Sequence, residues 1–296
     1  MFVNVSPNSE NIDELMKYLL YELKVKNMDV SKTLMIKLIF KIKKELGENH
    51  SLYSQLPYYW YFYGPYSQPV ADSFNFFSDA FEYTAPSRVL LKDEYFDDFE
   101  SNEFISKYPE IEQIAHGLIS DDLKFYKNIR KDIYRQYAPF DIMYPFKFNV
   151  FDIADKFRSA QQFNSDEFIK NLFKCESKLP CEAYYVKYNN LFSKFVTNLD
   201  LINEENNFNS CWDFLRDPIR DLWRTFVKGV RVEFKDDYYS YKEPAWNREY
   251  ISSLDELSIT INQTKKLVHL DNLQENDYTP AESKMINATI GGYLRG

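Results

Sequence analysis

The chain has 296 residues, of which 18% are aromatic and only 7 are glycine, and its formal net charge is -9. This length exceeds what one compact core usually holds, so we expect two domains or one core with a large helical extension. The negative charge argues against nonspecific binding of nucleic acid, whose phosphates require a positive protein surface. It suits solubility, a basic protein partner, or mimicry of the charge of a nucleic acid.

Cysteine content and hydrophobic runs indicate the compartment. Cys175, Cys181 and Cys211 are too few and too irregularly spaced for a disulfide framework or a zinc knuckle. The N-terminus does not read as a secretory leader, and no apolar run approaches the length needed to cross a bilayer. We therefore expect a cytoplasmic protein without a membrane segment.

The first predicted elements are two amphipathic helices. Asn11 and Glu14 have the spacing of a capping box, and apolar residues follow on one helical face. Ser31 is a suitable N-cap for the second helix, and Gly47 is a suitable residue to close it. The N-terminal part of the chain is thus predicted to be helical.

An aromatic run, 58–63, follows these helices and predicts a strand, because aromatic side chains favour half-buried pleated backbone. Gly64 can adopt angles that other residues avoid, and Pro65 cannot donate to a strand ladder, so we expect the strand to end there. Ser67 then has the right position and chemistry to cap a new helix at once.

Later in the chain, helical periodicity continues until prolines and aromatic residues interrupt it near 138–145. We place a domain boundary there, with a helical module over 1–140 and a mostly helical domain over 141–296. Alternation of apolar and polar residues predicts one further short strand over 230–234. The predicted fold class is mainly α with a small β-sheet or hairpin.

Glycine and histidine content limits the catalytic chemistry. A phosphate-binding loop needs clustered glycines at a strand-to-helix turn, and the chain has no such cluster. His50, His116 and His269 lie far apart, with no pair at the spacing of helical metal ligands. We expect no cofactor and no metal.

One spacing nevertheless favours an enzyme. Glu233 and Lys235 flank Phe234 on the predicted strand, and Asp217 and Asp221 precede them. Metal-dependent nucleases use acidic oxygens to hold a divalent cation and a lysine to steady the attacking water or the phosphate. The alternative interpretation is that these are solvated charges at a strand edge.

A second pattern is an arginine stripe, defined here as Arg216, Arg220 and Arg224, whose four-residue spacing places them on one side of a helix. Arginine forks bind carboxylates or phosphates, so this stripe is a candidate partner-binding surface. In the alternative interpretation the stripe pairs within the chain, with Asp213, Asp217 and Asp221.

The N-terminal third also shows an ordered series of features. They are Tyr18, Leu19 and Leu20 in the first helix, Leu34, Lys37, Leu38 and Phe40 in the second, the ending Tyr63-Gly64-Pro65-Tyr66-Ser67 of the aromatic strand, and Val70 in the next helix. This series resembles the Panacea domain, the SocA-like antitoxin family that includes phage-associated proteins, over about residues 11–137. The resemblance implies a compact, mainly helical module with a small sheet. It also implies direct binding of a protein partner, such as a cognate toxin encoded nearby.

These observations give two main hypotheses. The first is a noncatalytic antitoxin-type or phage-defence-associated protein that binds and neutralises a protein partner, with Tyr238, Tyr239 and Tyr241 as a further candidate binding patch. No catalytic residue comes with the resemblance, because its motif contains none. The alternative is the metal-dependent nuclease. A weaker third possibility is an acidic decoy that occupies a nucleic-acid site on a basic protein.

Overall fold

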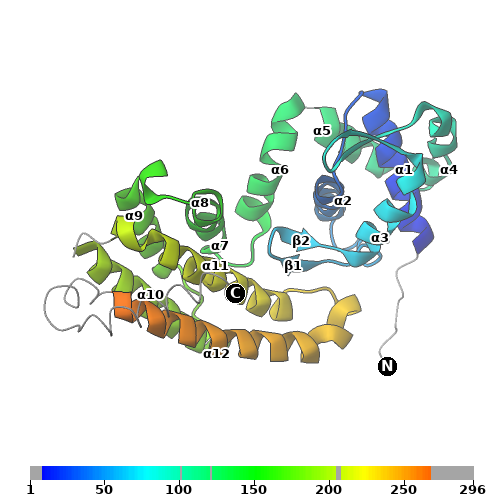
Figure 1. The fold of residues 1–296 in the computed structure, drawn as a ribbon. Coiled ribbons are helices and arrows are strands. Elements are labelled where there is room, and N and C mark those ends of the chain that lie inside the picture. Colours follow the sequence, from blue (N-terminus) through cyan, green and yellow to red (C-terminus); the bar gives the residue numbers. More distant parts are fainter. Residues whose placement is uncertain (1–8, 101, 121, 205–207, 268–296) are drawn as a thin grey trace, which may run out of the picture. The chain divides into compact units, whose positions relative to one another are not determined.

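The computed structural model describes residues 9–100, 102–120, 122–204 and 208–267. Helices dominate these residues, and their strands form two small antiparallel pairs. The predicted fold class, mainly α with a small hairpin, is therefore confirmed (Figure 1). None of the described helices is both long enough and apolar enough to cross a membrane.

The chain divides into two compact units. The first unit contains Met1–Tyr144 and Phe226–Ile251, and the second contains Pro145–Thr225 and Ser252–Gly296. The sequence places one boundary between residues 140 and 141. In the structure the chain leaves the first unit at a similar point but returns to it over residues 226–251.

The first unit is built around a buried central helix. Its elements are α1 (Ser9–Val25), α2 (Lys32–Leu46), β1 (Tyr59–Tyr61), β2 (Gly64–Tyr66), α3 (Gln68–Phe76), β3 (Phe81–Ala85), β4 (Arg88–Leu91), α4 (Asn102–Lys107), α5 (Pro109–Ser120) and α6 (Asp122–Tyr137). Helix α2 lies among α3, α5, α6 and β2 (Figure 1). Every residue from Leu34 to Lys43 is buried, so α2 is enclosed on all sides rather than on one face.

Helix ends in this unit follow local side-chain chemistry. The Ser31 hydroxyl accepts a hydrogen bond from the Leu34 N–H at 3.2 Å, and Gly47 ends α2 with φ +75°, as predicted. The predicted cap at Asn11 is wrong, because α1 already begins at Ser9. The Asn11 amide donates instead to the Gln55 side chain at 2.6 Å.

The aromatic run forms a hairpin rather than a strand followed directly by a helix. Gly64, Pro65 and Tyr66 make up β2, which pairs with β1 in the register Tyr59–Tyr66, Trp60–Pro65 and Tyr61–Gly64. A short edge strand tolerates proline because its outer N–H needs no ladder partner. The predicted cap holds, since the Ser67 hydroxyl accepts from the Val70 N–H at 3.4 Å at the start of α3.

The predicted strand over 230–234 is wrong. Helix α11 (Phe208–Glu233) runs through most of this segment, and its residues from Phe226 onward belong to the first unit. Val230 is fully buried, as is Phe226 four residues earlier, so the apolar spacing here is that of a helix face. The extended backbone comes just afterwards, where Lys235 forms an isolated antiparallel bridge with Tyr59.

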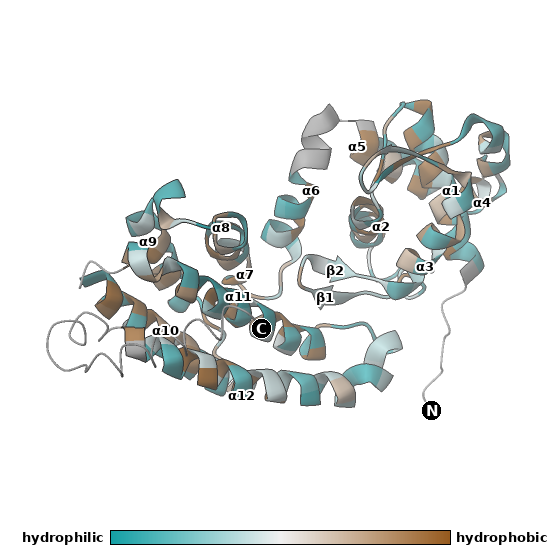
Figure 2. Ribbon diagram, in the orientation of Figure 1, coloured by the Kyte–Doolittle hydropathy of each residue, from teal (hydrophilic) through white to brown (hydrophobic). Residues whose placement is uncertain are grey.

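The described residues of the second unit form helices joined by short loops, with no strand among them. Its complete elements include a π-helix (Lys147–Phe151), α8 (Asp152–Lys156), α9 (Ser165–Glu176) and α10 (Val186–Glu204). Three helices are shared with the first unit: the second unit holds α7 (Met143–Phe146) from Pro145 on, α11 up to Thr225, and α12 (Glu243–Leu267) from Ser252 on. Figure 2 shows hydrophobic and hydrophilic residues alternating along α12, as a helix with one apolar side requires.

Aromatic rings and a few buried hydrogen bonds fill the core of the second unit. Phe146 packs edge-on against Trp223 and Phe192, with ring centroids 5.5 and 5.4 Å apart. Between α10 and α12, the Asn198 amide donates to the Ile261 carbonyl at 3.2 Å and to the Thr264 hydroxyl at 3.0 Å. These bonds satisfy an amide that burial would otherwise penalise.

Candidate functional site

An open pocket of about 420 Å³ lies beside the β1–β2 hairpin, entirely within the first unit. Its walls come from α2, the hairpin, the end of α6 and the segment that follows α11. The lining residues are Phe40, Lys43, Lys44, Tyr58, Tyr59, Trp60, Pro65, Tyr137, Pro139, Glu233, Phe234, Lys235 and Asp236. We call this the hairpin pocket. Aromatic rings and lysines dominate it.

The segment 234–236 closes one side of the hairpin by backbone pairing. The Trp60 N–H donates to the Phe234 carbonyl at 3.3 Å, and the Asp236 N–H donates to the Tyr58 carbonyl at 2.8 Å. These bonds extend the two-stranded hairpin by one bridge. They attach residues 234–236, which follow α11, to strand β1, which lies nearly 180 residues earlier in sequence.

The turn residues of the family resemblance shape this hairpin from within. Gly64 has φ +92°, a conformation that residues with a Cβ rarely adopt. A Cβ at this position would lie 3.1 Å from the Tyr134 ring and 3.3 Å from the Lys37 ammonium. Pro65 is buried and lines the pocket, whereas the Tyr63 side chain is exposed. Pro65 is therefore the motif residue that lines the pocket, and Tyr63 is the motif residue with an exposed side chain.

Lys37 lies beneath the turn, on the central helix. Its ammonium donates a hydrogen bond to the Pro65 carbonyl, and the side chain is buried. Burial, with a smaller contribution from the positive charge of Arg130, lowers the pKa of Lys37 to about 7. The Lys37 side chain, which is only partly charged at neutral pH, therefore holds the hairpin through its bond to the Pro65 carbonyl.

Lys43 and Asp236, which both line the hairpin pocket, form an ion pair. The two groups are 2.5 Å apart, and the same carboxylate accepts from the Tyr58 N–H at 2.5 Å. Lys43 also lies over the Tyr53 ring at 4.2 Å. Burial lowers the pKa of Lys43, and the nearby Asp236 opposes that shift. One carboxylate therefore fixes both the lysine and the start of β1.

The nuclease residues are divided between the two units. Glu233 is exposed at the rim of the hairpin pocket, and Lys235 pairs with Glu243 at 2.7 Å and donates to the Val232 carbonyl. Asp217 and Asp221 belong to the second unit. In the part of the chain that the structure describes, no three His, Cys, Asp or Glu residues gather in a way that could hold a metal ion.

The three tyrosines after α11 differ in exposure. Tyr239 is buried, and its hydroxyl accepts a hydrogen bond from the Gln68 N–H at 2.9 Å, so it ties this segment to α3. Its ring also packs edge-on against Tyr59, with centroids 4.8 Å apart. Tyr238 is half-buried, and Tyr241 is exposed. Of the predicted patch, Tyr241 is the residue most open to a partner.

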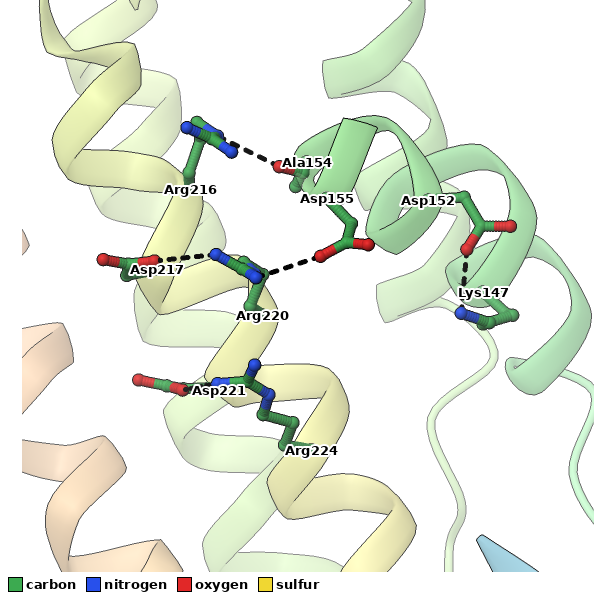
Figure 3. A network of polar contacts seen from close by, with 9 residues as sticks. All are labelled: Lys147, Asp152, Ala154, Asp155, Arg216, Asp217, Arg220, Asp221 and Arg224. Carbon is green, nitrogen blue, oxygen red and sulfur yellow. Dashed lines mark hydrogen bonds and ion pairs between the residues drawn. The ribbon is translucent and has the colours of Figure 1, made fainter. Parts of the chain in front are cut away.

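The arginine stripe lies in the second unit, where its guanidinium groups meet groups of the same chain (Figure 3). Arg216 donates to the Ala154 carbonyl at 3.0 Å. Arg220 bridges Asp155 at 3.0 Å and Asp217 at 3.4 Å, and Arg224 contacts Asp221 at 3.5 Å. This arrangement matches the intramolecular interpretation of the stripe for Asp217 and Asp221. Arg224, nearly half exposed, is the member most open to solvent.

The cysteines and the described histidines give no sign of catalysis. Cys175 and Cys211 are buried and Cys181 is exposed, and all three are free thiols. Burial raises the pKa of Cys175 to about 12, which keeps it protonated and unreactive. His50 pairs with Glu110, and His116 pairs with Glu22. His269 lies outside the described residues.

Sequence reasoning missed the buried lysines and Asp236. Lysines are almost always exposed, so nothing in a helical pattern distinguishes Lys43 from the exposed lysines of other helices. Its counter-charge Asp236 is 193 residues away in sequence. Comparison with protein-family models, with curated proteins and with solved structures finds no match to this chain.

Proposed function

We propose that this protein is a noncatalytic antitoxin-type or phage-defence-associated protein, which binds and neutralises a protein partner in the cytoplasm. The observation that carries the proposal is the hairpin pocket. The same Gly64–Pro65 turn that gives the resemblance to the Panacea domain forms the hairpin beside an open aromatic pocket. Pockets of this size, lined by rings with a few polar groups, are typical of binding sites.

The state of the pocket's charges favours binding over chemistry. Lys43 is paired with Asp236, Lys235 with Glu243, and Lys44 donates to the Tyr53 hydroxyl at 3.2 Å. Each cation already has a partner, so the surface offered to another molecule is largely aromatic. Phe234 is the clearest example, since its side chain lines the pocket and is 39% exposed. Aromatic anchors of this kind carry much of the energy of protein interfaces.

The test is coexpression of the full chain with the product of the adjacent gene. We expect the two proteins to copurify, and we expect the chain to relieve growth arrest caused by the neighbour. Phe234→Ser should weaken the complex about tenfold or more, because it removes a partly exposed anchor. Phe173→Ser is the matched control, since Phe173 is 40% exposed but belongs to the second unit, and it should leave affinity unchanged.

Two results would contradict the proposal. One is failure of the pair either to copurify or to relieve toxicity. The other is equal loss of affinity in the Phe234→Ser and Phe173→Ser variants, which would place the interface elsewhere. The nuclease hypothesis has a separate test, in which purified protein is incubated with DNA and RNA plus Mg²⁺ or Mn²⁺. Cleavage that Glu233→Ala abolishes would support it, and equal cleavage by that variant would discard the assignment.

A further inference from the structure

Strand β3 is an edge strand with one unpaired side. Among the described residues it pairs with β4 alone, in the register Phe81–Leu91, Glu82–Leu90 and Tyr83–Val89. The other side of β4 is occupied, because Val89 and Val30 exchange two backbone hydrogen bonds, each of 2.8 Å. The outer side of β3 therefore carries the free edge of this small sheet.

The Val30 bridge shows which backbone groups face that edge. Both the N–H and the carbonyl of Val89 point toward Val30, and hence away from β3. Tyr83 and Val89 are therefore a non-hydrogen-bonded pair of the antiparallel ladder, in which the backbone groups of both residues point outward. The N–H and carbonyl of Tyr83 thus face the outer side of β3, and no described residue bonds to them there.

The side chains around this edge are exposed as well. Residues 82–85 are all exposed, and the Tyr83 side chain is 76% exposed. Phe76, at the end of the preceding helix, is 75% exposed. A large aromatic side chain this open to water on a sheet edge, as Tyr83 is, marks a surface that gains free energy when another chain covers it.

Charge selects the kind of chain that fits. The segment 72–103 contains nine acidic and two basic residues, so it holds seven of the nine net negative charges of the protein. All nine acidic residues lie at exposed positions. Within the described part of the chain, six of them make no ion pair, namely Asp72, Asp79, Asp97, Asp98, Glu100 and Glu103.

We propose that the outer edge of β3 accepts an extended segment of a basic protein as an added strand. The inference rests on the proposed function, because it names the chemistry of the partner. Main-chain bonds to Tyr83 would give pairing, its ring would cover the partner's side chains, and the exposed carboxylates of segment 72–103 would attract lysines and arginines. A second copy of this chain is a poor occupant, since it would bring two acidic segments together. The bulge between Tyr83 and Ala85 limits the pairing to a short stretch.

The experiment uses the full chain and a labelled eight-residue peptide of alternating lysine and valine, followed by fluorescence anisotropy at low and high salt. We expect binding that weakens at least tenfold as salt rises from 50 to 300 mM, as for charge-assisted contacts at a surface. The same peptide N-methylated at alternate residues keeps its charge but loses strand donors, and should bind at least tenfold more weakly. A glutamate–valine peptide should not bind.

Variants at Tyr83 test the backbone directly. Tyr83→Pro removes the outward N–H without touching the bonds to β4, so the hairpin should tolerate it while peptide binding falls at least tenfold. Tyr83→Ala keeps the N–H and should bind more tightly than the proline variant. Hydrogen exchange at the Tyr83 amide, slowed by the peptide in the unmodified protein, gives a readout that needs no variant.

The proposal is overturned if the N-methylated peptide binds as tightly as its parent, if the proline and alanine variants bind equally, or if the peptide leaves the Tyr83 amide unprotected. The proposed function is judged separately, by the adjacent gene product. A partner that Phe234→Ser weakens and Tyr83→Pro does not leaves the proposed function standing and removes β3 from it. Peptide binding at Tyr83 without any copurifying neighbour supports the outer edge of β3 as a binding site and contradicts the proposed function.

Discussion

The ammonium group of Lys37, on the central helix, donates a hydrogen bond to the main-chain carbonyl of Pro65 in the hairpin. The contact joins the most buried helix of the first unit to the turn that lines its pocket. It also places an ionisable group where water cannot reach it, so that the protonation of one lysine becomes coupled to folding.

That coupling predicts a pH dependence with a definite sign. The pKa of Lys37 is about 7 in the folded protein and near 10.4 in an unfolded chain. Between these values the unfolded chain binds more protons, so the free energy of unfolding rises with pH, by up to about 1.4 kcal/mol per pH unit. From pH 7 to pH 9 the unmodified protein should gain roughly 2 kcal/mol more than Lys37→Met. Urea denaturation measures both, and identical pH dependence in the two proteins would contradict the assignment.

Gly64 should resist substitution more strongly than Gly47, although both have positive φ. A Cβ on Gly47 meets nothing within 4 Å, whereas a Cβ on Gly64 meets Tyr134 and Lys37 at close range. We expect Gly47→Ala to lower the free energy of unfolding by about 1–2 kcal/mol, from backbone strain alone. Gly64→Ala should cost at least about 1 kcal/mol more. Chemical denaturation of the two variants measures the difference, and equal costs would show that the turn, Tyr134 and Lys37 shift to make room for the added methyl group.

The Lys43–Asp236 pair should matter far more than an exposed pair of the same length. Asp236→Asn keeps an acceptor for Tyr58 but leaves Lys43 without its counter-charge, and we expect a loss of about 2–3 kcal/mol. Asp255→Asn is the control, because Asp255 also lies 2.5 Å from a lysine but both partners are exposed. It should cost under about 0.5 kcal/mol.

Adding Lys43→Met to Asp236→Asn separates charge from packing. If the loss arises from an uncompensated buried charge, the double variant should recover part of the stability that Asp236→Asn removes. No recovery in urea denaturation would mean that the carboxylate acts mainly through the Tyr58 N–H.

Within the arginine stripe, stability should depend on Arg220 more than on Arg224. Arg220 bridges Asp155 and Asp217, which lie on different segments, whereas among the described residues the carboxylate that pairs with Arg224 is Asp221 of its own helix (Figure 3). We expect Arg220→Ala to cost about 1 kcal/mol and Arg224→Ala under about 0.5 kcal/mol, since exposed i,i+3 pairs contribute little. Thermal denaturation ranks the two variants, and the reverse order would show that the bridge to Asp155 contributes nothing.

Local elements were predictable where a few neighbouring residues decide the backbone. Ser31, Gly47 and Ser67 end or begin helices through bonds that span three or four residues, and each acts as predicted. Gly64 and Pro65 were more difficult, because their conformational preferences fit either a plain turn or a short edge strand. The partner strand and Lys37 select the strand.

Segment 230–234 shows the opposite limit. Its alternation of apolar and polar residues fits a strand, but burial of Val230 together with Phe226 requires a helix. Five residues are too few to distinguish the periodicity of a strand from that of a helix, and only the packing of the whole unit does so. The same applies to Asp236, whose partners Lys43 and Tyr58 are known only once the chain has returned to the first unit.

By itself the sequence determined a mainly helical fold, the helix ends at Ser31, Gly47 and Ser67, and an aromatic strand that meets a Gly-Pro turn, because these features depend on side chains close together along the chain. The tertiary structure alone decided that lysines of α2 are buried, that residues 226–251 rejoin the first unit, and that Tyr83 faces an open sheet edge. Those outcomes depend on contacts between residues far apart in sequence, whose free energy no local pattern records.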